Sequence, residues 1–187
     1  MKYLIISGNP KTDGLNYSVM EQIKKGAEDG GAEVEILTVK DLTPCKMCNG
    51  GWGICRDQNR CAFENDGFGD AHKAVKEADK ICIISPVYWM EVSEGLKTFL
   101  DRLRRCEARS TAEEGIKGKQ VLLVASAGGS GFGLMNCLSQ MERFTTQTGA
   151  VVYDFIPINR WNNDYKKASA YAAARAMAEG RKTGDTI

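Results

Sequence analysis

Short apolar runs alternate with longer amphipathic stretches along most of the chain. The runs with the length and composition of buried strands are residues 2–7, 33–39, 80–85, 120–125 and 150–156. The stretches that repeat apolar residues at helical spacing start near residue 16 and then cover 68–78, 93–105, 134–148 and 164–180. Such alternation gives a parallel sheet with helices on both faces and right-handed crossovers. The pattern predicts one doubly wound α/β domain over residues 1–187, with five strands in the order 2-1-3-4-5.

Two large aromatic residues follow the third strand. Pro86 is expected to end that strand, because proline has no N–H for a ladder. Tyr88 and Trp89 then stand at the carboxyl edge of the sheet, where open α/β sheets bind ligands. They are predicted to wall a flat ring. Core packing or a subunit interface is the alternative, because both settings also favour Tyr and Trp.

The loops after the first and fourth strands favour a phosphate and a close backbone contact. Residues 8–16 form a polar turn that leads into a helix, whose free N-terminal amides favour an anion. Neither a Walker motif nor G-x-G-x-x-G is present, so a monophosphate fits better than a dinucleotide. The glycine-rich run 128–131 would let backbone N–H groups meet a planar ring. The three loops together indicate a flavin mononucleotide (FMN) site, although a plain βα turn remains an alternative for the first.

Two motifs carry a family resemblance. Residues 7–16, Ser-Gly-Asn-Pro-Lys…Gly-Leu-Asn, and residues 85–102, Ser-Pro-Val-Tyr-Trp-Met…Asp-Arg, resemble the flavodoxin-like NAD(P)H-dependent FMN reductase family, near its iron–sulfur flavoprotein branch. The resemblance implies a flavodoxin-like fold, FMN as cofactor, NAD(P)H as co-substrate, and a homodimer or homotetramer. Family members usually start with a Ser-Pro-Arg type of loop, from which Asn9 and Lys11 depart.

The resemblance also implies which residues bind the cofactor. Those implied for the FMN phosphate are Ser7, Asn9, Lys11, Gly14, Leu15 and Asn16. Those implied to line the flavin ring are Pro86, Val87, Tyr88, Trp89 and Met90. The third loop contributes Ala127, Gly128, Gly129 and Gly131.

Four of the seven cysteines lie in a predicted insertion at about residues 41–66, and they are Cys45, Cys48, Cys55 and Cys61. Four thiolates in a short span can ligate a [4Fe–4S] cluster. In the iron–sulfur flavoproteins the third cysteine follows only two residues after the second, whereas six residues intervene here. We therefore assign no metal and keep the cluster as an alternative. The other interpretations are a Cys45–Cys48 redox dithiol and simple packing; zinc is disfavoured because only one C-x-x-C pair is present.

Composition and charge bear on which classes of partner the protein binds and on where it is located. The net charge of +1 does not indicate binding to nucleic acid or to an anionic membrane, and no apolar run approaches the roughly 20 residues of a membrane span. The first apolar run is too short for a signal peptide, so we expect a cytoplasmic protein. His72, the only histidine, and the cluster Arg102 to Arg105 are both expected to face solvent.

These features predict an FMN-dependent oxidoreductase that moves electrons from NAD(P)H to a flavin, a quinone or a protein acceptor. No catalytic side chain is assigned, because the flavin carries the chemistry. The alternative is an iron–sulfur flavoprotein or a flavodoxin-like electron carrier that does not use NAD(P)H directly. A redox sensor switched by Cys45 and Cys48 is a weaker third hypothesis. Receiver-domain signalling and NTPase activity are disfavoured, since the third strand lacks an acceptor aspartate and no Walker motif occurs.

Overall fold

The computed structural model describes residues 1–182, and residues 183–187 of the predicted domain lie outside the described part. Its parallel sheet has the strand order β2-β1-β3-β5-β6. These strands are β1 (Lys2–Ser7), β2 (Glu33–Thr38), β3 (Lys80–Tyr88), β5 (Gln120–Ala127) and β6 (Val151–Asn159). A further short strand, β4 (Glu91–Val92), pairs only with β3. The predicted doubly wound, flavodoxin-like fold is therefore confirmed, and β4 is the strand that the sequence pattern missed.

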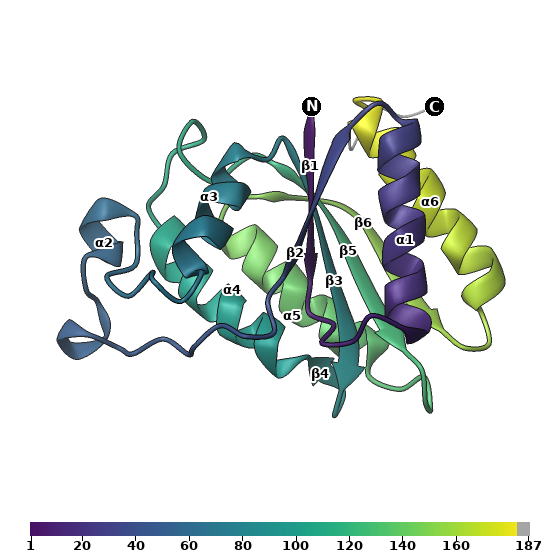
Figure 1. Cartoon of the computed structure of the whole chain (residues 1–187), viewed down its shortest axis with the longest axis horizontal. Helices are drawn as coiled ribbons and strands as arrows, with labels where there is room; N and C mark the ends of the chain where they lie inside the picture. The colour runs from purple at the N-terminus through teal and green to yellow at the C-terminus, as the bar shows by residue number, and fades with distance from the viewer. Residues whose placement is uncertain (183–187) are drawn as a thin grey trace.

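Helices cover both faces of the sheet (Figure 1). One face carries α1 (Gly14–Asp29) and α6 (Asn163–Ala178), and the other carries α3 (Phe68–Glu77), α4 (Glu94–Glu107) and α5 (Leu134–Gln147). Alternate residues of each central strand enter opposite cores: Ile83 packs toward α4, and Cys82 packs toward α1. Both residues are fully buried, as expected for a sheet covered on two faces. Cys82 is thus a core residue and lies apart from the four cysteines of residues 41–66.

The third strand is longer than predicted. It continues through Pro86 to Tyr88 and turns back into β4. The proline is tolerated because β1 flanks β3 only as far as Ile84, while β5 still pairs beside Pro86. One side of β3 is thus a free edge at Pro86, where a missing N–H costs no ladder bond. The prediction that Pro86 ends the strand was wrong.

The cysteine-rich segment, residues 41–66, contains two short helices where only a loop was expected. They are η1 (Asn49–Gly51) and α2 (Cys55–Gln58). Figure 1 shows this segment at the left edge of the molecule, beyond α4. Across residues 1–182, no helix combines the length and the apolar character that a membrane crossing needs.

His72 is buried, not solvent-facing, with only 4% of its surface exposed. Its Nε2 lies 2.5 Å from Oε1 of Glu107, and the other oxygen of Glu107 accepts hydrogen bonds from Ser110 Oγ and Ile116 N. Burial acts to raise the pKa of Glu107, but these hydrogen bonds outweigh it and leave the pKa lowered. The histidine therefore fastens α3 to the end of α4, and the charged neighbours along the sequence gave no sign of this long-range partner.

Candidate flavin site and cysteine pocket

Three loops meet at the carboxyl edge of the sheet, at the bottom of Figure 1. They are residues 8–13 after β1, the turn 89–90 after β3, and residues 128–133 after β5. Because β1, β3 and β5 are adjacent parallel strands, their carboxyl ends emerge side by side. The structure thus brings together the three loops in which the cofactor residues were predicted.

The first loop is shaped by its own side chains. Asn9 Nδ2 donates to the carbonyl of Lys11 at 2.8 Å, and Ser7 Oγ accepts from Asn9 N at 3.3 Å. Ser7 and Asn9 are buried, whereas the Lys11 side chain is exposed. Gly14, at the start of α1, has a φ of +78° and open space around it, so its backbone is accessible. This loop therefore offers backbone amides and one lysine to an anion.

Two serines lock this loop to the third strand and to α4. Ser93 Oγ donates to the Gly8 carbonyl at 2.7 Å, and Ser85 Oγ accepts from Ser93 N at 3.0 Å. A Cβ on Gly8 would lie 2.5 Å from Ser93 Oγ and 2.8 Å from Leu96 Cβ, so only glycine fits there. Sequence reasoning assigned no role to Ser85 or Ser93, because their partners lie far away in the chain.

Asn16 joins the start of α1, just after the first loop, to the end of β5, just before the third. It lies in the first turn of α1, is 6% exposed, and its Nδ2 donates to Ser126 Oγ at 2.8 Å. Its Oδ1 is buried without a hydrogen-bond partner. A buried polar atom left unpaired costs about 1–3 kcal/mol, and such atoms are rare in native proteins. An orphaned acceptor at a ligand-binding edge fits a hydroxyl-bearing ligand, and the ribityl chain of FMN carries such hydroxyls.

The turn between β3 and β4 projects an aromatic side chain. Trp89 and Met90 have φ values of +48° and +68°, a backbone conformation that costs non-glycine residues roughly 1–2 kcal/mol each. The third loop and the start of α5 support the turn: Asn136 Nδ2 on α5 donates to the Met90 carbonyl at 2.9 Å, and Gly133 in the loop packs so closely that a Cβ there would clash with Met90 Cα. Trp89 is 96% exposed and Tyr88 half-buried, so neither is a core residue.

The remaining predicted residues lie around these loops. Pro86 and Ala127 are buried within their strands, Val87 and Leu15 are partly buried, and Gly128 and Gly129 are exposed with open space around them. Their contacts with a flavin stay a prediction. The exposed glycine backbone fits a ligand that approaches closely.

Trp161 is a second exposed tryptophan at this edge, and the sequence analysis missed it. It follows β6, where Asn159 Oδ1 accepts from its backbone N at 2.9 Å, and the Arg160 guanidinium stacks 4.6 Å from its ring centre. A Cβ on Gly131, whose φ is +76°, would lie 2.7 Å from the indole Cζ3. Trp161 therefore rests on the glycine loop. An aromatic residue directly after a strand was the available signal, as it was for Trp89.

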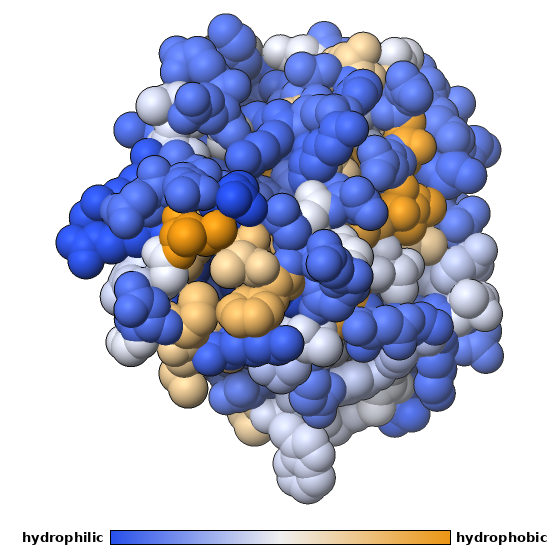
Figure 2. All heavy atoms as spheres, turned by 60° about the vertical axis from the view of Figure 1, so that its left-hand side comes forward, coloured by the Kyte–Doolittle hydropathy of each residue, from blue (hydrophilic) through white to orange (hydrophobic). Residues whose placement is uncertain are grey.

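The four cysteines of the cysteine-rich segment line one pocket with residues of α4. Cys55 is buried, and Cys45, Cys48 and Cys61 are half-buried. Figure 2 turns this side of the molecule forward and shows apolar side chains gathered among hydrophilic ones. Within residues 1–182, however, no three cysteine, histidine or carboxylate side chains are grouped to hold one metal ion. The donor chemistry suits a thiolate-bound cluster, whereas the sulfur atoms are not arranged around a single ion.

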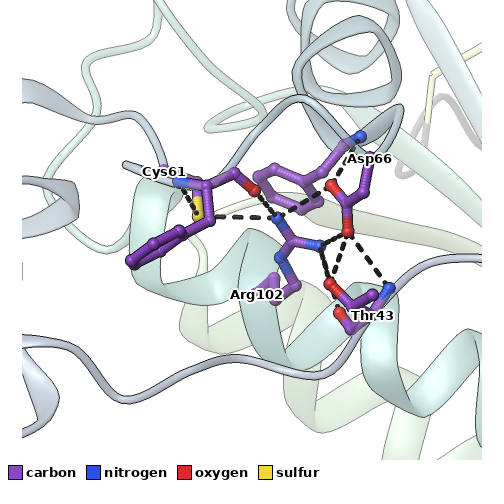
Figure 3. A network of polar contacts seen from close by, with 6 residues as sticks. Thr43, Cys61, Asp66 and Arg102 are labelled. Carbon is purple, nitrogen blue, oxygen red and sulfur yellow. Dashed lines mark hydrogen bonds and ion pairs between the residues drawn. The ribbon is translucent and has the colours of Figure 1, made fainter.

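Arg102 ties both ends of the cysteine-rich segment to α4 (Figure 3). Its Nη1 donates to Asp66 Oδ2 at 2.6 Å and to the Thr43 carbonyl at 3.0 Å. Its Nη2 donates to the Phe63 carbonyl at 2.5 Å and to Cys61 Sγ at 3.5 Å. The Arg102 side chain is 2% exposed, so the prediction that it faces solvent was wrong. A planar guanidinium has enough donors to satisfy all these acceptors at once, which permits its burial.

The contact with Arg102 changes the pKa of the Asp66 carboxyl. Partial burial acts to raise its pKa, but hydrogen bonds from Arg102 and Thr43 outweigh that effect and hold the pKa well below its usual range. The ionised form of Asp66 therefore contributes to stability.

Comparisons with known proteins agree with this geometry. The family model for NADPH-dependent FMN reductase matches residues 1–158. An iron–sulfur flavoprotein of Archaeoglobus fulgidus is 29% identical over 182 residues, which cover 95% of this chain and 80% of that protein. An iron–sulfur flavoprotein of Methanocaldococcus jannaschii is 34% identical over 106 residues, which cover 56% of this chain and about half (52%) of that protein.

A solved structure, the NAD(P)H:quinone oxidoreductase of Methanothermobacter marburgensis, superposes with a TM-score of 0.70 at 16% identity. The superposition covers 95% of this chain and 96% of that one. At this identity the likeness establishes the fold alone.

Asn16→Ala should weaken FMN binding about tenfold, because one or two ligand hydrogen bonds of about 1 kcal/mol each are lost. Quenching of FMN fluorescence on titration into apoprotein measures the dissociation constant. Ser18→Ala, two residues further along α1, is the matched control, since Ser18 Oγ donates to the Leu15 carbonyl. An unchanged dissociation constant in a folded Asn16→Ala variant would show that Asn16 does not contact FMN.

Asp66→Asn should lower the free energy of unfolding by about 2 kcal/mol at neutral pH, the usual size for hydrogen bonds to a charged group. Because the folded-state pKa is depressed, this contribution is complete above the unfolded pKa of about 4 and is lost as the pH falls through the folded pKa. The difference between wild type and variant should therefore shrink below about pH 4 in urea unfolding. Asp57→Asn, an exposed change in the same segment, should show neither effect. A difference that stays constant down to acid pH would contradict the role of the ionised Asp66.

Proposed function

This chain belongs to the NADPH-dependent FMN reductase family and is a flavin-dependent oxidoreductase; from that premise we propose that it takes electrons from NAD(P)H and passes them to a flavin, a quinone or a protein acceptor. When bound, FMN supplies the capacity to accept a hydride and to release electrons onward. The observation that carries the proposal is the buried, unpaired Oδ1 of Asn16, which lies where the loops after β1 and β5 meet.

The chain would hold FMN with backbone groups more than with charges. The free amides at the start of α1 and the accessible backbone of Gly14 suit the phosphate. The turn with Tyr88 and Trp89 would flank the ring, and the exposed backbone of residues 128–129 would meet its polar edge.

The site provides little acid–base chemistry of its own. Residues 8–13, 89–90 and 128–133 contain two charged side chains, Lys11 and Asp13, and no histidine. His72 is buried against Glu107 on α4, within a different network. The protein's part is therefore to bind and orient the reactants and to exclude water.

The exposed aromatic residues suggest how the site is completed. Trp89, Phe132 and Trp161 all lie on loops at this edge and are largely exposed. Exposed aromatic side chains are enriched at interfaces. A homodimer or homotetramer that covers this edge belongs to the proposal.

FMN-loaded protein mixed anaerobically with NADPH or NADH should lose its oxidised-flavin absorbance. Stopped-flow absorbance compares the two nucleotides and identifies the preferred one. If neither bleaches the flavin while dithionite does, direct use of a nicotinamide is ruled out and the electron-carrier alternative replaces this proposal.

A second candidate is an iron–sulfur flavoprotein, because the four cysteines of the segment line one pocket. A [4Fe–4S] cluster is held by four cysteine thiolates. The half-buried sulfur atoms of Cys45, Cys48 and Cys61 and the buried sulfur of Cys55 would supply the four ligands.

Anaerobically purified protein should then contain about four iron and four sulfide per chain, the content of one such cluster. Cys48→Ala should abolish most of this content, whereas Cys82→Ala, a change in the opposite core, should preserve it. Wild-type protein that stays free of iron and sulfide after anaerobic reconstitution would remove this candidate and leave the FMN proposal intact.

A further inference from the structure

A fifth cysteine reaches the pocket of the cysteine-rich segment. Cys106 lies in the last turn of α4, is 1% exposed, and lines the same pocket as the four segment cysteines. Neither the sequence spacing nor any motif connected it with them, because it follows Cys61 by 45 positions.

Arg102 connects Cys61 to the face of α4 that carries Cys106. Arg102 and Cys106 are four residues apart on the helix and therefore share a face. The Arg102 guanidinium donates to Cys61 Sγ at 3.5 Å, so Cys61 lies over that face. Among neighbouring side chains, Cys61 is also the largest contributor to the raised pKa of Cys106, ahead of Cys55, although burial is the main cause.

We propose that Cys61 and Cys106 form a reversible disulfide when a small thiol oxidant enters the pocket. The bond would fasten the cysteine-rich segment covalently to α4. The proposal rests on neither FMN nor a cluster, because it needs only these two thiols and an oxidant.

The two sulfur atoms have unequal roles. Cys61 is half-buried and so accessible to an oxidant, and its sulfur accepts a hydrogen bond from the Arg102 guanidinium. Cys106 is enclosed and reacts second, from within the pocket. The oxidant therefore reacts first with Cys61 of the cysteine-rich segment and the disulfide then forms with Cys106 of α4.

Diamide, a diazene, is a suitable oxidant for forming this disulfide. The Cys61 thiolate adds to one nitrogen of the N=N bond and forms an S–N bond. Cys106 sulfur then attacks Cys61 sulfur, the S–S bond forms, and the S–N bond breaks. The two thiols together lose two electrons and two protons, and the diazene gains both to become a hydrazine.

The bond would also decide whether the segment can bind a metal. A Cys61 sulfur held in a disulfide cannot serve as a thiolate ligand. Oxidised protein should therefore take up less iron during reconstitution than reduced protein, and dithiothreitol should restore the uptake. If reduced wild-type protein takes up no iron, the cluster candidate fails, while the disulfide is still tested by its own chemistry.

Tryptic mapping tests the linkage directly. Cleavage after Lys and Arg leaves Cys61 as the one cysteine of peptide 61–73 and Cys106 as the one cysteine of peptide 106–109. Cys45 falls in peptide 41–46. Cys48 and Cys55 fall together in peptide 47–56. The full-length protein is treated with diamide, alkylated, digested without reductant and analysed by mass spectrometry. We expect the 61–73 peptide joined to the 106–109 peptide, and the loss of two of the seven free thiols.

Two variants sharpen the result. Cys106→Ala should lose the linked peptide and keep all its remaining thiols titratable at the same oxidant dose. Cys82→Ala, which removes an equally buried cysteine from the opposite core, should form the link as wild type does. A different pairing in the wild type, such as Cys45 with Cys48, or seven thiols that resist oxidation, would overturn the proposal.

Discussion

The hydrogen bonds that α4 makes with distant segments are the constraint on which both sites depend. At its N-terminal end, Ser93 holds the Gly8 carbonyl and contacts Ser85, which fixes the first loop against the third strand. Near its C-terminal end, Arg102 holds Asp66 and the Thr43 carbonyl. These bonds are buried or partly buried, so losing one partner would leave a polar group unsatisfied in the interior. One helix thus orients the flavin edge and anchors the cysteine-rich segment.

The same helix also keeps the two sites apart. Its 14 residues span about 21 Å at 1.5 Å per residue, with Ser93 just before the first turn and Cys106 in the last. A chemical change at the cysteine pocket is therefore remote from the loops after β1 and β3 in the same chain. What the pocket can influence directly is the cysteine-rich segment, whose ends Arg102 fixes and whose middle carries α2.

The sequence predicted the sheet well because strand and helix periodicities are local signals. Five apolar runs and their intervening helices define the order around the switch point, and the three ligand loops follow from that order. The failures involve partners that lie far away in the chain. Arg102 was predicted to face solvent at a helix end, but it is buried against Asp66 and the Phe63 carbonyl. His72 was predicted to be exposed, but it is buried against Glu107. The prediction that Pro86 ends the third strand failed for a related reason. A proline fits within β3 because β1 stops pairing with β3 at Ile84, and the sequence does not show where that pairing ends.

The candidate flavin edge combines two features that are unfavourable without a ligand. Trp89 and Met90 hold left-handed backbone conformations, and the Asn16 Oδ1 is buried without a partner. Each costs on the order of 1–3 kcal/mol, a notable fraction of the 5–15 kcal/mol by which a domain is usually stable. Asn136 on α5 and Gly133 in the third loop contact Met90, so the backbone of the turn that carries Trp89 is held before any ligand arrives. Since a pre-organised turn loses little conformational freedom on binding, this turn favours a flat ligand that stacks on its aromatic residues, and the unpaired Oδ1 of Asn16 favours one that carries hydroxyls.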